Sequence, residues 1–128
     1  MKALLTLAAA LIAAPLAAAP VATSLPGVSD QETEIAYGGI QQFERGHGDV
    51  LFVRDRADRW YRLGLNPGCL KGSLQMRRVV FRNDSSGSRI DRFTTIELPD
   101  DLRTCAIDSI RLSAAPPQVD SHSPVTLD

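Results

Sequence analysis

The sequence predicts a mainly β domain: a small antiparallel meander sheet of about five strands, with a short N-terminal helical turn and one disulfide bond. Three observations predict this class. Apolar runs alternate with turn clusters rich in Pro, Gly, Asn, Asp and Ser. Residues 49–65 have the pattern of a β-hairpin. The chain contains an even number of cysteines, Cys69 and Cys105.

The chain length and the net charge limit the number of domains and the kinds of partner that we expect. The chain has 128 residues, which is enough for one domain. Its 14 Lys and Arg residues face 15 Asp and Glu residues, for a formal net charge of -1. A dedicated nucleic-acid-binding domain would carry a clear basic excess. We therefore expect no nucleic-acid partner.

Residues 1–19 have the layout of a secretory signal peptide. Met1 and Lys2 form a short positive start, and an alanine-rich apolar run and small residues follow. Proline is a poor residue just after a cleavage site, so Pro20 leaves the cut open between positions 18 and 24. The run is too short for a membrane anchor. We expect a periplasmic or secreted protein with no transmembrane segment in its mature chain.

The segments around the predicted domain are assigned from composition and spacing. Residues 20–34 contain Pro, Ser and Gly without periodicity and predict a flexible lead-in. Residues 35–46 predict a short helical turn, because Ile40 and Phe43 are three apart. The β-rich domain is expected to span residues 35–112. Residues 113–128 contain three prolines and predict a disordered tail.

The hairpin predicts which side chains form the core. Residues 50–53 and residues 59–65 are its two strands, and residues 54–58 are its turn. Side chains alternate between the two faces of a strand. One face then carries the expected core residues Leu51, Val53, Tyr61, Leu63 and Leu65.

Three more strands are expected: one within residues 74–82, one at residues 90–98 and one at residues 102–112. Polar turn clusters separate them. Arg78 and Arg92 interrupt the apolar alternation. Two explanations stay open: bulges that shift the strand register, or positions near sheet edges.

Cys69 and Cys105 allow a single intramolecular pairing, which closes a loop of 36 positions. A disulfide of this span contributes about 3–4 kcal/mol in the chain-entropy model. A redox pair would have two intervening residues, and that motif is absent. A zinc site needs four ligands, and the chain adds only His47 and His122. We therefore expect a structural disulfide, with neither a metal nor another cofactor.

The second face of the hairpin is the candidate binding site. It would carry Phe52, Arg54, Trp60 and Arg62, together with Val50. Arginine can stack on tryptophan in a cation–π contact. Such a face suits an anionic envelope ligand or a protein partner. The alternative is a structural role, in which arginines cover aromatic surface packed against the Ile40 and Phe43 turn.

Two further functions compete with a binding or envelope accessory domain. A small periplasmic hydrolase could use His47 with Asp49, or the carboxylates of Asp55 and Asp58 that flank the hairpin turn. Turn chemistry and neighbouring arginines explain the two aspartates better. The other competitor is an inhibitor that presents its loops to a secreted protein. No residue is assigned a catalytic role, and the sequence does not indicate the oligomeric state.

One set of residues within positions 40–110 forms a recognisable pattern: Ile40, Phe43, Asp49, Leu51, Arg59-Trp60-Tyr61, Cys69, Asp91-Arg92-Phe93-Thr94 and Cys105. In this pattern the chain resembles an uncharacterised domain-of-unknown-function family of small, signal-bearing proteins from Gram-negative bacteria. The resemblance implies a secreted β-rich domain with a disulfide. It implies no activity and no catalytic residue.

Overall fold

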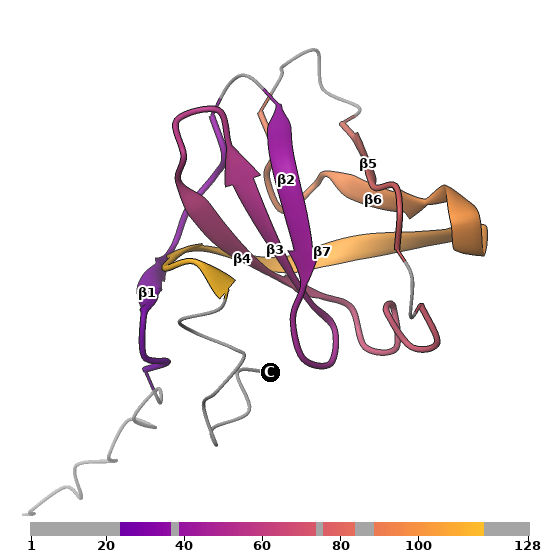
Figure 1. The fold of residues 1–128 in the computed structure, drawn as a ribbon, viewed down its shortest axis with the longest axis horizontal. Coiled ribbons are helices and arrows are strands. Elements are labelled where there is room, and N and C mark those ends of the chain that lie inside the picture. The colour runs from indigo at the N-terminus through magenta and orange to yellow at the C-terminus, as the bar shows by residue number, and fades with distance from the viewer. Residues whose placement is uncertain (1–23, 37–38, 74–75, 84–88, 117–128) are drawn as a thin grey trace, which may run out of the picture.

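The computed structural model describes residues 24–36, 39–73, 76–83 and 89–116, which form a curled antiparallel sheet (Figure 1). The predicted mainly β class and the single disulfide are confirmed. The predicted signal peptide lies outside the described residues, as do residues 117–128 of the predicted tail. The strands are β1 (Val28–Glu32), β2 (Ile40–Arg45), β3 (Val50–Asp55), β4 (Trp60–Leu65), β5 (Val80–Arg82), β6 (Thr95–Leu98) and β7 (Arg103–Ser113).

Two antiparallel units make up the sheet. Its strand order is β2-β3-β4-β7-β6-β5, and β1 pairs with β7 as well. The first unit, β2-β3-β4, and the second, β5-β6-β7, are each connected in sequence order. They meet where β4 pairs with β7. This order places β2 and β5 at the two ends of the path.

Strand β7 is the longest strand and joins the two units (Figure 1). Its first residues pair with β6, as in Ile96 opposite Cys105. Its later residues pair with β4, as in Leu63 opposite Ile110. β6 pairs with the start of β7, and strand β1 pairs with the end of β7, near Ser113. The last part of β7 therefore has a neighbour on both edges.

The interior of the curl is the main hydrophobic core. All five residues predicted for the core from the hairpin pattern are buried there. They are joined by residues of the second unit, including Ile96, Leu98, Cys105 and Ile110. Burying one large apolar side chain contributes about 1.5–3 kcal/mol. The alternation of the hairpin thus identified one wall of the core.

The N-terminal part of the domain differs from the prediction. The expected helical turn at residues 35–46 is wrong, because residues 40–45 form strand β2. The register of β2 against β3 shifts between Ile40 and Gln42. A bulge adds one residue to a strand, so side chains three apart can point to the same face. That shift gave Ile40 and Phe43 their helix-like spacing.

The expected flexible lead-in also contains ordered structure. Strand β1 pairs with β7 by main-chain contacts, including a hydrogen bond from Ala114 N to Gly27 O. Farther along, Ile35 and Ile90 form an isolated antiparallel bridge. Four of the five β1 residues are not fully buried. Their polar side chains concealed the strand in the sequence.

Two of the three later strands, β5 and β6, are shorter than predicted. Within residues 74–82, of which 74–75 are outside the described part, only Val80–Arg82 is a strand. Within residues 90–98, the strand begins at Thr95. Arg92 lies in the turn before it and Arg78 precedes β5, so neither interrupts a strand. Leu102 adopts a left-handed conformation with φ 50° before β7 begins.

The disulfide fastens the segment after β4 to the second unit. Cys69 and Cys105 pair with their Cα atoms 5.8 Å apart, within the usual range for a disulfide. Both residues are buried. Arg103 adds hydrogen bonds from its Nη1 to the carbonyl oxygens of Cys69 at 2.6 Å and Lys71 at 2.8 Å. Residues 66–72 are therefore held by both covalent and polar contacts.

Candidate functional site

A groove lies between the two ends of the sheet path, β2 and β5. Its volume is about 640 Å³, within the range of about 300–1,000 Å³ that is typical of ligand sites. We call it the edge groove. It is lined by residues 39–43 on the β2 side, by residues 79–81 on the β5 side, and by Asn83, Arg89, Ile90 and Thr94.

The apolar part of the edge groove continues the main core. Ile40 and Phe43 from the β2 side, and Val79 and Phe81 from the β5 side, pack against the buried cluster but stay partly exposed. Phe43 lies opposite Val53, and Phe81 lies opposite Ile96. Both Val53 and Ile96 are fully buried. The groove is therefore the place where core-facing side chains of this sheet reach solvent.

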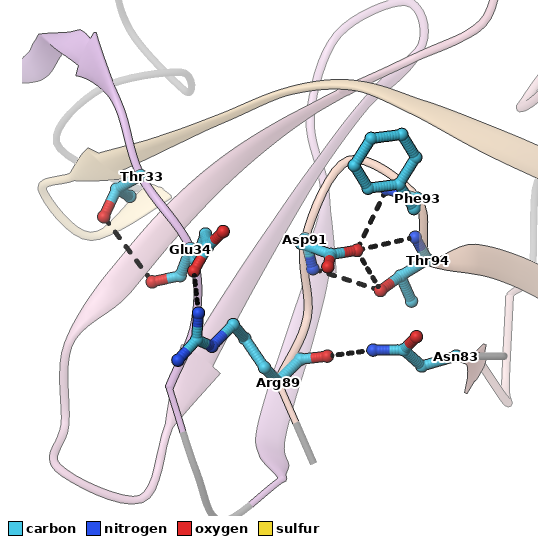
Figure 2. A network of polar contacts seen from close by, with 7 residues as sticks. All are labelled: Thr33, Glu34, Asn83, Arg89, Asp91, Phe93 and Thr94. Carbon is cyan, nitrogen blue, oxygen red and sulfur yellow. Dashed lines mark hydrogen bonds and ion pairs between the residues drawn. The ribbon is translucent and has the colours of Figure 1, made fainter. Parts of the chain in front are cut away.

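A polar network borders the edge groove (Figure 2). Asn83 Nδ2 donates to the carbonyl oxygen of Arg89 at 2.6 Å. Arg89 Nη1 lies 2.8 Å from Glu34 Oε2, and both of these side chains are half-exposed. An ion pair this exposed contributes about 1 kcal/mol or less. The network connects the β5 side to the segment that follows β1.

Next to this network, Asp91 organises the turn that leads into β6 (Figure 2). Its Oδ1 accepts hydrogen bonds from Phe93 N at 2.9 Å and Thr94 N at 3.0 Å. An aspartate that bonds the backbone two and three residues ahead stabilises a turn. Thr94 is buried as a result, while the Phe93 side chain projects outwards with 88% exposure.

The predicted aromatic and basic face of the hairpin forms a second packed cluster. Phe52 is fully buried, and Arg62 is only 6% exposed. Val28, Val50 and Phe52 form this cluster, with Leu25, Trp60 and Ala114 packed against it. Residues before and at the start of β1, and the residue after β7, therefore cover the face. The expected packing against Ile40 and Phe43 is wrong, because those two residues contact the main core.

Arg54 and Trp60 remain the accessible part of that face. The Arg54 guanidinium carbon lies 5.8 Å from the centre of the Trp60 ring, a cation–π contact. Arg54 also lies 3.7 Å from the Asp58 carboxylate. These contacts hold the arginine along the ring.

Asp49, a candidate of the alternative hydrolase hypothesis, has a structural role in the loop after β4. Its carboxylate accepts hydrogen bonds from Gly68 N at 2.7 Å and Leu70 N at 2.9 Å. The bond from Leu70 N is the main cause that lowers the pKa of Asp49, with help from Gly68 N and two arginines. His47 is exposed in the loop between β2 and β3. The carboxylate is thus directed at the backbone of residues 68–70.

Asp55, another candidate of the alternative hydrolase hypothesis, is buried at the β3–β4 turn with 1% exposure. Its oxygens accept from the backbone of Ala57 at 2.8 Å and Arg59 at 3.0 Å. Arg59 Nε at 2.9 Å and Tyr61 Oη at 3.1 Å also donate to it. Burial alone would raise the pKa of Asp55, but these hydrogen bonds outweigh it and lower the pKa.

The two carboxylates of the alternative hydrolase hypothesis, Asp55 and Asp58, lie in different environments within one turn. The Asp58 side chain is 77% exposed, whereas that of Asp55 is almost fully buried. Asp58 has a φ of 60° and donates its backbone N–H to Asp55 O. Burial and the neighbouring Asp55 charge raise the pKa of Tyr61. Together these contacts make a tightly bonded turn.

The described residues offer neither a metal-binding cluster nor a membrane-spanning helix. Within these residues, no group of three or more His, Cys, Asp and Glu side chains has an arrangement that could hold a metal ion. In the same part of the chain, no helix has the length and hydropathy needed to cross a membrane.

The sequence interpretation did not find the edge groove. Its two walls are separated by roughly 40 positions, and only the topology brings them to the same opening. A weak local signal was present, because Ile40 and Phe43 are apolar residues in an otherwise polar segment and residues 79–81 form a short apolar run after two arginines. A fold that placed both segments at sheet edges would have revealed it.

The fold and the groove define a disulfide-linked, curled antiparallel sheet with an apolar opening between its end strands. Comparison with protein-family models, with curated proteins and with solved structures gave no match. The resemblance described from the sequence therefore stays a prediction.

Proposed function

We propose that this chain is a periplasmic or secreted binding domain without catalytic activity, and that the edge groove is its ligand site. The observation that carries the proposal is the groove itself. Core-facing side chains, including Phe43 and Phe81, reach solvent there between two sheet ends. Apolar concave sites with a few polar groups at the border are the usual places for ligands.

The contacts of the competing carboxylates also favour binding over hydrolysis. Asp49 is bonded to two backbone N–H groups, and Asp55 accepts four hydrogen bonds. A general acid needs a pKa near the working pH, whereas both of these pKa values are lowered. These side chains stabilise loops, which leaves the groove as the better candidate.

The cellular location is part of the same proposal. The signal-like layout of residues 1–19 and the Cys69–Cys105 disulfide both fit an oxidising compartment. Fractionation of the native bacterium, followed by mass measurement of the protein, tests it. A shortened, disulfide-bonded chain outside the cytoplasm is expected. A full-length reduced chain in the cytoplasm would contradict it.

Groove binding is tested with Nile red, an uncharged apolar dye. Saturable binding is expected, with NMR shift changes at the amides of Ile40, Phe43 and Val79 and unchanged amides around Trp60. Val79→Asp should weaken dye binding at least about tenfold, because a charge would be placed in an apolar wall. Leu102→Asp is the matched control, since Leu102 is 95% exposed and does not line the groove.

Circular dichroism verifies that both variants stay folded. Equal dye affinity in the two folded variants, or shift changes centred on Trp60, would contradict the groove as the ligand site. The NMR map decides the question without any variant, so a poorly folded Val79→Asp protein does not remove the test.

A further inference from the structure

We infer that the occupant of the edge groove is an acidic segment of another polypeptide, bound in extended conformation by main-chain pairing with β2. This inference rests on the proposed function, because it names the ligand class of the same groove. It follows from three features: the main-chain direction along β2, the apolar wall, and the charges beside the β5 wall.

The pairing of β2 fixes which of its main-chain groups face away from β3. Gly46 N donates to Val50 O at 2.9 Å, which closes the hairpin between β2 and β3. Residues of an antiparallel strand direct their N–H and C=O groups alternately to one side and the other. Glu44 and Gln42 therefore face β3, whereas the main-chain groups of Phe43 and Arg45 face away from it.

Among the described strands, β2 pairs with β3 alone. Strand edges of this kind serve as templates on which an extended peptide adds one more strand. β2 has six residues and β5 has three, so β2 offers the longer edge. The occupant accordingly pairs with β2 and lies against the side chains of the β5 wall.

The side chains of the groove specify the sequence of the occupant. Phe43 and Phe81 supply apolar surface that suits every second residue of an extended segment. Arg77 and Arg78, both exposed, directly precede Val79 of the groove wall. Within the described residues neither arginine has an ion pair, whereas Arg82 is paired with Glu97.

This charge distribution favours carboxylates on the occupant. Two cationic side chains beside an apolar wall attract a segment that alternates apolar and acidic residues. Residues 76–81, which lead into and form the β5 wall, contain Arg77 and Arg78 and no Asp or Glu. A basic segment would meet like charge here, which disfavours it.

The test uses the full oxidised chain and a short end-blocked peptide that alternates valine and glutamate. Amide hydrogen exchange is measured by NMR with and without the peptide. Exchange at Phe43 and Arg45 is expected to slow at least about tenfold, because their N–H groups gain partners. Glu44 and Gln42 amides, which already face β3, should change little. Protection elsewhere, with Phe43 and Arg45 unchanged, would overturn strand addition.

Charge selection is tested with the double variant Arg77→Glu and Arg78→Glu. Both positions are exposed, so the fold should be retained. Affinity for the valine–glutamate peptide should fall at least about tenfold, and a valine–lysine peptide should become the better ligand. The matched control is Arg56→Glu with Arg92→Glu, which makes the same charge change at exposed positions that are not adjacent to the β5 wall at residues 79–81.

The outcomes separate this inference from the proposed function. Nile red binding in the groove without peptide binding would overturn the polypeptide occupant and keep the groove as a ligand site. Absence of both would overturn both proposals. Protection of Phe43 that grows with protein concentration alone would identify a second copy of the chain as the occupant. An unchanged peptide preference in the double variant would overturn the acidic class.

Discussion

The two ends of the sheet path differ sharply from its middle, although all of these strands obey the same alternation. In the middle, β4 pairs with β7, and Leu63 and Ile110 on these strands are fully buried. At the ends, Phe43 on β2 and Phe81 on β5 point to the same core but remain partly exposed. All four residues are apolar, so their character does not explain the difference in exposure. Among the described strands, β2 and β5 each have a neighbouring strand on one edge only, which leaves their side chains partly open to solvent.

This comparison explains why a domain with an opening can still be stable. The paired middle holds both buried clusters, on the two faces of β3 and β4. The disulfide and Arg103 then attach the segment after β4 to the start of β7. The ends of the path contribute less to the core, so they are free to form a ligand site. Changes in the middle should therefore cost much more stability than changes at the ends.

Phe52→Ala should give the largest loss of stability. Phe52 is fully buried in the second cluster, and removing a large buried side chain costs about 3–5 kcal/mol. Denaturant unfolding measures the loss. The partly exposed Trp60 on the same face is the control, and Trp60→Ala should cost less. A folded Phe52→Ala variant of unchanged stability would show that this face does not hold the domain together.

Removal of the disulfide by Cys69→Ala with Cys105→Ala should follow in size. The bond closes a loop of 36 positions, which corresponds to about 3–4 kcal/mol. The midpoint of denaturant unfolding, compared with that of the oxidised wild type, measures the effect. If the loss stayed near zero, Asp49 and Arg103 alone would be sufficient to hold residues 66–72.

Asp55→Asn should reduce stability by about 1–3 kcal/mol near neutral pH, because a buried hydrogen-bond network loses one of its two acceptor oxygens and its negative charge. The effect should depend on pH in a definite direction. The pKa of Asp55 is lowered in the folded protein, so its contribution is present above the unfolded pKa and is lost as the pH falls through the folded value.

Stability measured from neutral pH down to below about pH 3 tests this direction. The gap between wild type and Asp55→Asn should narrow as the pH falls below about 4. Asp58→Asn is the matched control, since Asp58 lies in the same turn but its side chain is 77% exposed. A gap that widens in acid would contradict the assigned role of Asp55.

The sequence predicted the parts of the fold that depend on neighbouring residues. The hairpin of β3 and β4 and its core face followed from alternation, because Leu51, Val53 and Leu63 face one interior. Strand β2 was misread because its bulge gives Ile40 and Phe43 the spacing of a helix. Strand β1 is held by pairing with β7, a partner about 80 positions away, which no local pattern could indicate.

The candidate site was harder to predict for the same reason. The sequence left both a binding role and a packed structural role open for Phe52 and Trp60, because alternation tells which side chains share a face but not what covers that face. The covering residues Leu25, Val28 and Ala114 come from the two ends of the domain. The edge groove likewise depends on β2 and β5 reaching the same opening.

The smallest expected effects compare one residue of the middle with one of the ends. A Cβ atom added at Gly64 of β4 would lie 2.6 Å from Ser109 Oγ, so Gly64→Ala should cost about 1–2 kcal/mol as Ser109 shifts. Gln41 is exposed at the β2 end, and Gln41→Ala should change stability by less than about 0.5 kcal/mol. Denaturant unfolding of both variants measures and compares their losses of stability. A costlier Gln41→Ala would mean that the groove wall contributes to the fold as much as the paired middle does.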